Sequence, residues 1–398
     1  MTKVQVDSNG KVIMLNNKAL EASEGGVTPT GTLSITANGT YDVTNYVSAD
    51  VNVSGGGGST TGFLVQVIDY DGTVLKSERL DTGATFTLPS QPSHTGLVFQ
   101  SWSSPVTITN NAVTVTNSDI TIGATYTTAS GLSEFDITLT TVTGLSVTLN
   151  MDGTKDWGDG TSDTNTTHTY STVGDYTITC NGSTMTTSSS SGLFGQSSSA
   201  INYYVKDVRF GSSVTSIGSS TFSSCYSLAN VIIPNSVTSI SSNTFYYCRS
   251  LTNVIIPNSI TSIGSSVFYG CYSLTNIVIP EDVTSISGNA FFYCYSLANI
   301  VIPEGVTSIS SNTFYYCYSL TNIIIPEGVT SIGTYAFYHC YSVLEYDFSR
   351  YTAIPTLSDT TAFLGINKIC KIKVPASLET EWKTATNWST YADYIVGV

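Results

Sequence analysis

Apolar residues recur at a fixed spacing through the second half of the chain. Cysteine returns every 23 residues, with Phe three residues before it and Leu or Val three residues after it. An apolar triplet that ends at proline and a Val/Ile-Thr-Ser-Ile segment complete most units. A unit this short cannot bury its own apolar face, so the units must stack into a solenoid with one continuous core. The repeated cysteines are Cys225, Cys248, Cys271, Cys294, Cys317 and Cys340.

Each apolar triplet predicts one short parallel strand, because successive strand residues point to opposite faces. In the first unit Val231 and Ile233 would face the core, and Pro234 would end the strand because it has no amide donor. The outward positions form an aliphatic column, which predicts either a contact with a partner or the seam of a homo-oligomer. This column consists of Ile232, Ile255, Val278, Val301 and Ile324.

The ends of the repeat region are expected to be capped. Residues 204–217 match the strand half of a unit but carry three charged residues, as a capping turn should. After Cys340 the pattern decays, residues 371–375 predict a last strand, and residues 376–388 predict a short amphipathic helix over the open core. We therefore place the solenoid and its C-terminal cap at residues 204–398.

The repeat resembles the BspA-like leucine-rich repeat family, whose pattern runs Leu-x-x-Ile-x-Ile-Pro, Val-Thr-Ser-Ile-Gly, Ala-Phe, Cys. The small residue before the repeated Phe is often Thr or Val here, and the positions around Cys are heavily Tyr. The resemblance implies extracellular adhesion and ligand binding without catalysis.

The first half of the chain predicts small β modules. Asn9-Gly10 and Asn38-Gly39 predict turns between short strands in residues 1–58, and "SGGGGST" (54–60) has the composition of a flexible linker. The phrase "ITANGTYDVTNYVSADVNV" is similar to a module of structural proteins from phages that infect Gram-positive bacteria. This resemblance implies that residues 1–58 attach the chain to a virion.

Two further modules precede the solenoid. Residues 63–128, with Asp71-Gly72, Phe99 and Trp102, resemble the internalin-type B-repeat, which implies a β-grasp-like spacer or adhesive stalk. Residues 133–183 contain "DWGDG" and "HTYSTVGDYTI" and resemble the polycystic-kidney-disease (PKD) domain, which implies an Ig-like sandwich. The expected fold class is mainly β, with small β modules followed by a leucine-rich-repeat solenoid.

Composition and charge narrow the partners. Only 11% of residues are charged, against roughly 25% in typical soluble proteins, and the net charge is −14. Phosphate backbones and anionic lipid surfaces would repel such a chain, so nucleic acid is not expected as a partner. No apolar run approaches the roughly 20 residues that a membrane-spanning helix needs, so membrane insertion is not expected. The first residues do not resemble a secretory signal, which favours a virion component released by lysis.

The cysteines allow two interpretations. Side chains in successive turns run parallel, which favours a column of buried thiols over a disulfide or metal framework. A loop with Asp152, Asp156, Asp159 and Asp163 is interpreted as turn-forming, with calcium binding as the alternative. We therefore expect no metal and no cofactor.

Catalytic motifs are missing. His94, His168 and His339 lie in neither a nucleophile elbow nor a zinc-binding helix motif. A hydrolase would need a carboxylate pair or a triad, for which the sequence offers no pattern. The chain is therefore not expected to be an enzyme.

Tyrosine gathers around each repeated cysteine. Stacked turns would align these side chains into surface stripes, and Tyr offers a large contact area and a hydroxyl at low entropic cost. The stripes predict a ligand site for a glycan or protein, or else rings that merely pack against each other. The candidate ligand-binding residues are Tyr226, Arg249, Tyr272, Tyr295, Tyr318, Tyr341, Tyr247, Tyr293 and Tyr316.

These features predict a phage virion fibre or spike on the virion surface. The leucine-rich-repeat domain would bind a host cell-surface glycan or protein, and residues 1–58 would bind other virion proteins. We also expect a homo-oligomer. The alternative is a BspA-like adhesin on a bacterial cell surface, for which the full gene would encode a signal peptide or a cell-wall anchor.

Overall fold

The computed structural model describes residues 62–94, 97–116, 119–128, 135–149, 153–181 and 203–398. Before residue 62 it describes only the backbone of five short strands, of which β1 pairs antiparallel with β2 and with β4. The predicted turns at Asn9-Gly10 and Asn38 lie outside the described residues. The five strands are β1 (Lys3–Val6), β2 (Val12–Met14), β3 (Ser34–Ile35), β4 (Gly39–Asp42) and β5 (Asn52–Val53).

Residues 62–128 form a small unit around a four-stranded sheet of order β7-β6-β11-β9. The two central strands, β6 and β11, run parallel, and their neighbours pair with them antiparallel. Val65, Val67, Ile120 and Ile122 alternate toward the core and are fully buried there. The strands are β6 (Phe63–Ile68), β7 (Val74–Leu80), β8 (Thr85–Thr87), β9 (Leu97–Ser103), β10 (Ala112–Thr114) and β11 (Ile120–Thr128).

Residues 135–181 form a second β unit whose main sheet continues into the solenoid. Strand β18 (Val205–Phe210) pairs antiparallel with β12 on one side and parallel with β20, the first triplet strand, on the other. The unit therefore extends the repeat sheet at its N-terminal end. Its strands are β12 (Phe135–Thr141), β13 (Ser146–Thr148), β14 (Thr154–Asp156), β15 (Ser162–Asp163), β16 (Thr167–Thr169) and β17 (Gly174–Asn181).

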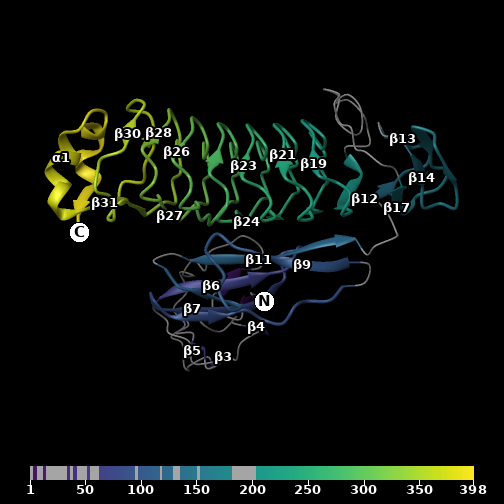
Figure 1. The fold of residues 1–398 in the computed structure, drawn as a ribbon, viewed down its shortest axis with the longest axis horizontal. Coiled ribbons are helices and arrows are strands. Elements are labelled where there is room, and N and C mark those ends of the chain that lie inside the picture. Colours follow the sequence, from purple (N-terminus) through teal and green to yellow (C-terminus); the bar gives the residue numbers. More distant parts are fainter. Residues whose placement is uncertain are drawn as a thin grey trace, which may run out of the picture.

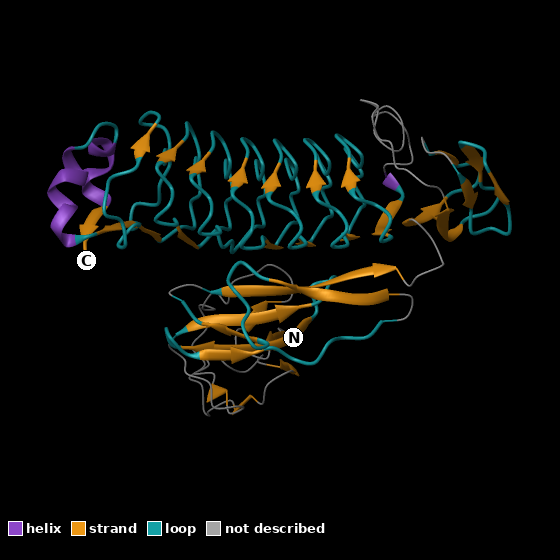
Figure 2. Ribbon diagram, in the orientation of Figure 1, coloured by secondary structure: helices purple, strands orange, loops and turns teal. Residues whose placement is uncertain are grey.

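The predicted solenoid is present and rises as a regular stack (Figures 1 and 2). Most turns contribute one strand from the apolar triplet and a second at Ser-Ile, and equivalent residues pair in register, as Ser262 does with Ser285. The triplet strands are β20 (Asn230–Ile232), β22 (Asn253–Ile255), β24 (Asn276–Val278), β27 (Asn322–Ile324), β29 (Glu345–Asp347) and β31 (Lys371–Val374). The second set is β19 (Ser216–Ile217), β21 (Ser239–Ile240), β23 (Ser262–Ile263), β25 (Ser285–Ile286), β26 (Ser308–Ile309), β28 (Ser331–Ile332) and β30 (Thr356–Leu357).

The solenoid core consists of ladders of identical side chains. The rings of Phe245 and Phe268 stack with centroids 5.6 Å apart, and Phe291 and Phe314 stack at 5.5 Å. The repeated Cys and Leu columns lie in the same buried cluster. Because one cluster runs through all turns, each turn is stabilised mainly by its two neighbours.

The C-terminal end is closed by a cap of short helices. They are η2 (Ala376–Leu378), α1 (Glu379–Thr384) and η3 (Trp388–Tyr394), followed by strand β32 (Ile395–Gly397). Trp382 and Trp388 are buried, and each ring contacts Phe348. The prediction of a helical lid is confirmed, although the α-helix is shorter than expected. Among the described residues no helix is long and apolar enough to cross a bilayer.

The unit of residues 62–128 lies against the triplet-strand face of the solenoid (Figure 1). Ser103 Oγ donates to the carbonyl of Ile256 at 2.5 Å, and the amide of Glu281 donates to the carbonyl of Ser104 at 3.0 Å. Asn258 Nδ2 donates to the carbonyl of Trp102 at 3.1 Å. The prediction that this unit acts as an extended spacer is therefore wrong for the described structure, because the unit packs alongside the repeats.

Candidate binding surfaces

The turn before each repeated cysteine holds a bulky residue in a left-handed backbone conformation. The φ angles of Tyr247, Tyr293, Tyr316 and His339 are 57°, 61°, 60° and 57°. Such angles are unusual for large side chains and need support from neighbouring structure. Hydrogen bonds between turns provide it, as when the amide of Tyr293 donates to the carbonyl of Tyr315 at 2.9 Å. The fold therefore fixes where these aromatic side chains leave the backbone.

The tyrosines that follow the cysteines form a continuous ladder. Ring centroids are 5.0 Å apart for Tyr272 and Tyr295, 5.1 Å for Tyr295 and Tyr318, and 5.6 Å for Tyr318 and Tyr341. Tyr318 and Tyr341 are 38% and 46% exposed. At the other end, the Arg249 guanidinium lies over the ring of Tyr226, 4.6 Å from its centroid, and so continues the column as a cation–π contact.

A second ladder lies beside the first. Tyr293 stacks on Tyr316 at 5.5 Å, and Tyr316 stacks on His339 at 5.0 Å. At Gly270 the ladder has no ring, and the Tyr247 ring covers the glycine so closely that an added Cβ would lie 2.4 Å from its Cδ1. The structure thus brings all nine predicted ligand-binding residues to one side of the repeats. We call them the tyrosine ridge: Tyr226, Tyr247, Arg249, Tyr272, Tyr293, Tyr295, Tyr316, Tyr318 and Tyr341.

A third aromatic ladder underlies the ridge and was not among the predicted site residues. Its rings stack more closely, with centroids 4.6 Å apart for Tyr269 and Phe292 and 4.2 Å for Phe292 and Tyr315. Tyr293 contacts Phe292 edge-on at 4.3 Å. The same repeat period marks these positions in the sequence, but only the backbone conformation shows which ring supports which. The ladder contains Tyr246, Tyr269, Phe292, Tyr315 and Tyr338.

The ridge hydroxyls stay protonated near neutral pH. Burial, followed by the neighbouring tyrosines, raises the pKa of Tyr295 to about 12. Burial also raises the pKa of Tyr272 and Tyr318. Burial lowers the pKa of His339, which keeps this imidazole neutral. The ridge therefore presents aromatic rings and neutral hydroxyls, and Arg249 is its only charged member.

The outward aliphatic column differs from the prediction of an exposed strip. Ile232 belongs to the core of the 62–128 unit, and Ile255 and Val278 form a buried cluster with Ile68 of that unit. These three side chains are at most 6% exposed, so they contact another part of the same chain. Val301 stays half-buried at the edge of the contact, and the side chain of Ile324 is not among those described.

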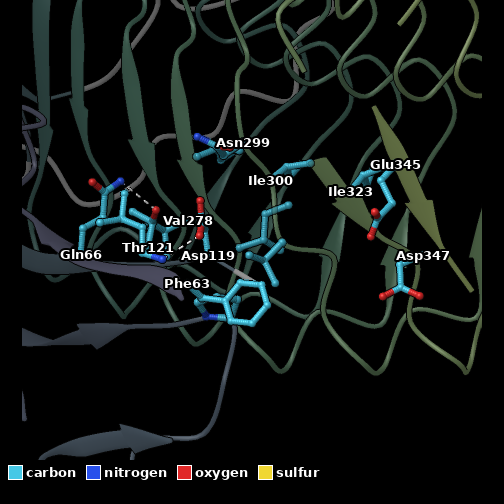
Figure 3. Close-up of a pocket in the computed structure, with 15 residues that line it drawn as sticks. Phe63, Gln66, Asp119, Thr121, Val278, Asn299, Ile300, Ile323, Glu345 and Asp347 are labelled. Carbon is cyan, nitrogen blue, oxygen red and sulfur yellow. Dashed lines mark hydrogen bonds between the residues drawn. The ribbon is translucent and has the colours of Figure 1, made fainter. Parts of the chain in front are cut away.

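A wedge-shaped pocket opens where the 62–128 unit leaves the solenoid (Figure 3). Its volume is about 210 Å³. Leu64, Gln66 and Thr121 line one wall, and Val278 and Val301 line the other. Carboxylates stand on both sides, with Asp119 on the unit and Glu345 and Asp347 on β29. Sequence reasoning missed this pocket because it exists only where two distant segments meet.

The cysteines and the aspartate loop have structural roles. All eight cysteines are free and buried, which confirms the buried-thiol interpretation. In the loop, Asp159 Oδ1 accepts from Thr161, and Asp163 Oδ1 accepts from Trp157 Nε1 and from the amide of Asn165. These bonds are those of turn-forming aspartates, while Asp152 lies outside the described residues. No cluster of three or more potential metal-ligating side chains occurs within the described part of the chain.

The repeat region matches a known family. The model described as the BspA type leucine rich repeat region matches residues 196–321 and 284–385, in six copies. No curated protein is similar in sequence to the chain.

Three solved structures resemble parts of the chain, and the chain spans less than two thirds of each. They are a leucine-rich repeat protein of T. pallidum (32% identity over 33% of this chain and 62% of that chain, TM-score 0.31), one of Eubacterium ventriosum (23%, 39% and 42%, TM-score 0.36), and a leucine rich cell surface protein of Faecalibacterium prausnitzii (26%, 42% and 64%, TM-score 0.24). The family match and the stacked turns together identify residues 196–385 as a BspA-type leucine-rich repeat region.

Proposed function

We propose that the chain is a cell-surface adhesion protein of the BspA-like kind, which binds a glycan or protein through the tyrosine ridge. The match of the repeat region to the BspA-type family supports this reading over the phage fibre. The observation that carries the proposal is the ladder from Tyr272 to Tyr341, whose rings repeat at 5.0 to 5.6 Å and become exposed toward Tyr341.

The chemistry of the ridge suits adhesion. Stacked rings are already ordered before binding, so contact costs little side-chain entropy. Their faces and edges offer apolar area to a sugar ring or a protein, and the neutral hydroxyls offer hydrogen bonds. Because each turn repeats the same group, an extended ligand meets many weak contacts at once, which raises the total affinity. No step of this function requires catalysis.

The test replaces three ladder tyrosines, as Tyr272→Ser, Tyr295→Ser and Tyr318→Ser together, and measures binding of the full chain to bacterial and host cells. We expect the apparent affinity to fall by about tenfold or more, because several stacked contacts are lost together. Circular dichroism should show an unchanged β spectrum, since these side chains are not in the core ladders.

The matched control changes three exposed threonines in the same turns, as Thr261→Ser, Thr284→Ser and Thr307→Ser. This variant should bind as the original chain does. If the tyrosine variant binds as well as the control, the ridge is not the adhesive site.

A phage virion fibre is the second candidate function. The resemblance of the phrase within residues 33–53 to phage structural modules favours it. In that reading residues 1–58 would contact other virion proteins in a homo-oligomeric fibre, and the ridge would bind the host. Gold labelling of the chain on native particles in negative-stain images distinguishes the two, since only a fibre decorates virions.

A further inference from the structure

We infer that the wedge between the 62–128 unit and the solenoid is a binding pocket for an alkylammonium group, such as a lysine side chain or a free alkyl diamine. The pocket is distinct from the tyrosine ridge, and the inference does not rest on the proposed adhesion. Its walls come from strands β6 and β11 on one side and from the outward face of the repeats on the other (Figure 3).

The size of the pocket fits a small organic ligand. Its volume is about 210 Å³, and an apolar protein cavity of about 150 Å³ is enough to hold benzene. The walls supply apolar contact for a short carbon chain through Phe63, Val278 and Val301. Such walls favour a ligand with an aliphatic stem over a bare inorganic cation.

The charge of the pocket selects a cation. Its lining contains the carboxylates of Asp119, Glu345 and Asp347 and no basic side chain. Glu345 and Asp347 are two residues apart on β29, so both project from the same face of the strand. An ammonium group donates three hydrogen bonds and accepts none, which matches a site lined by acceptors. The net charge of −14 adds a long-range field that draws cations to the molecule.

The one nearby cation leaves room for a ligand. Lys373 Nζ lies 2.8 Å from Glu345 Oε1, with both side chains more than a third exposed. An exposed pair of this kind contributes little stability, so an incoming ammonium group can share or replace it. Asp119 and Asp347 each use one oxygen to accept a main-chain amide, from Leu64 at 2.7 Å and from Ser349 at 2.8 Å. These bonds hold both carboxylates in position.

The repeat sheet is interrupted at the pocket. Strand β24 pairs with β22 and β27 pairs with β29, while Ile300 and Val301 between them belong to no strand. The wedge therefore coincides with a break in an otherwise regular ladder. Further carbonyl oxygens near the wall would add acceptors for the same ammonium group.

The experiment titrates the full chain with cadaverine, a five-carbon diamine, by isothermal calorimetry at low salt. We expect saturable binding that weakens as salt rises, and no binding of the diol of equal length. The double variant Asp119→Asn, Asp347→Asn keeps both amide acceptors but removes one charge from each wall, and should bind about tenfold more weakly or less.

The control variant Glu327→Gln removes an exposed charge on the same solenoid outside the pocket and should bind as the original chain does. Equal binding of cadaverine by the double variant and the control would overturn the inference, as would equal binding of the diol. Comparing cadaverine with an amide-blocked lysine shows whether a free diamine or a lysine side chain is preferred. The serine variant of the ridge should keep cadaverine binding, which separates this site from the proposed adhesion.

Discussion

The repeated cysteines keep their thiols inside the stack and use them as hydrogen-bond donors. Cys248 Sγ donates to the carbonyl of Phe222 at 3.2 Å, and Cys271 Sγ donates to that of Phe245 at 3.2 Å. The next three cysteines in the column make the same bond. A thiol suits this position because it is small and weakly polar, and a main-chain oxygen satisfies it without water.

The buried thiols predict that the solenoid becomes less stable in alkali. Burial raises the pKa of Cys225, Cys248, Cys271 and Cys294 above the ordinary value of 9.0. A group whose pKa is raised by folding contributes its full stability below the unfolded pKa and loses it as the pH climbs above that value. The denaturant midpoint should therefore fall as the pH rises beyond about 9.

The double variant Cys271→Ala, Cys294→Ala is the control for this titration. With two fewer thiols to ionise in the unfolded chain, its midpoint should fall less steeply between about pH 8.5 and 9.5. Equal slopes for the variant and the original chain would mean that the thiols do not govern the alkaline loss.

At this scale the sequence predicted which residues face the core but not which surface residues are covered. Alternation placed Val231 and Ile233 inward, and both are buried. It placed Ile232 outward as well, yet Ile232 is buried because a segment distant in sequence lies over it. Alternation reports only the face to which a residue points. The left-handed backbone of Tyr247 and Tyr293 was equally invisible, since the hydrogen bonds that support it come from the next turn.

Strand β18 joins two kinds of sheet. It runs parallel to β20 of the solenoid and antiparallel to β12, with Val208 opposite both Val231 and Ile137. A solenoid whose first strand ended in solvent would present free amide and carbonyl groups to other chains. The unit of residues 135–181 covers that edge, so it acts as the N-terminal cap.

The substitution Val208→Pro tests this cap. Proline removes an amide donor from a strand that is paired on both sides, so the free energy of unfolding should fall by about 3 kcal/mol or more. The control is Thr143→Pro, which falls within the turn where the amide of Leu145 donates to the carbonyl of Val142 and where proline is well tolerated. Denaturant unfolding of both variants measures the difference, and equal midpoints would contradict the capping role.

The sequence predicted part of this arrangement. The strand-like character and the charged residues of 204–217 indicated a cap at the start of the repeats. The partner β12 was not predictable, because it begins 70 residues before β18 and antiparallel pairing leaves no periodic mark. The division of the first half into modules 1–58, 63–128 and 133–183, and their β-grasp-like and Ig-like character, remain predictions.

On the scale of the whole molecule, the 62–128 unit braces the repeats instead of extending from them. Gly123 allows the close approach, since a Cβ there would lie 2.6 Å from a side-chain carbon of Ile255. Polar bonds surround this apolar contact, including one at 2.9 Å from Asn235 Nδ2 to Ser101 Oγ. No spacing rule could reveal the interface, because single residues from four strands and three turns create it.

The variant Ile255→Asp should release the unit. It places a carboxylate among Ile68 and Val278 without a partner, and burying an unpaired charge costs more than such a small contact can offset. We expect a larger radius of gyration in small-angle X-ray scattering, with the β spectrum retained. The control Leu344→Asp changes a residue that is 48% exposed and should leave the radius unchanged. An unchanged radius for Ile255→Asp would show that the unit is held by other contacts.

The stack of in-register turns also shapes how such a gene can change. Every turn meets its neighbours through the same ring, thiol and hydroxyl contacts, so the loss or duplication of one 23-residue segment rejoins equivalent surfaces. Recombination between near-identical repeats could then alter the length of the aromatic face in whole steps. The brace limits where this can happen, because a change between Ile232 and Val278 would shift the points on which the 62–128 unit rests. Variation in copy number is therefore best tolerated from Val301 onward, toward the C-terminal cap.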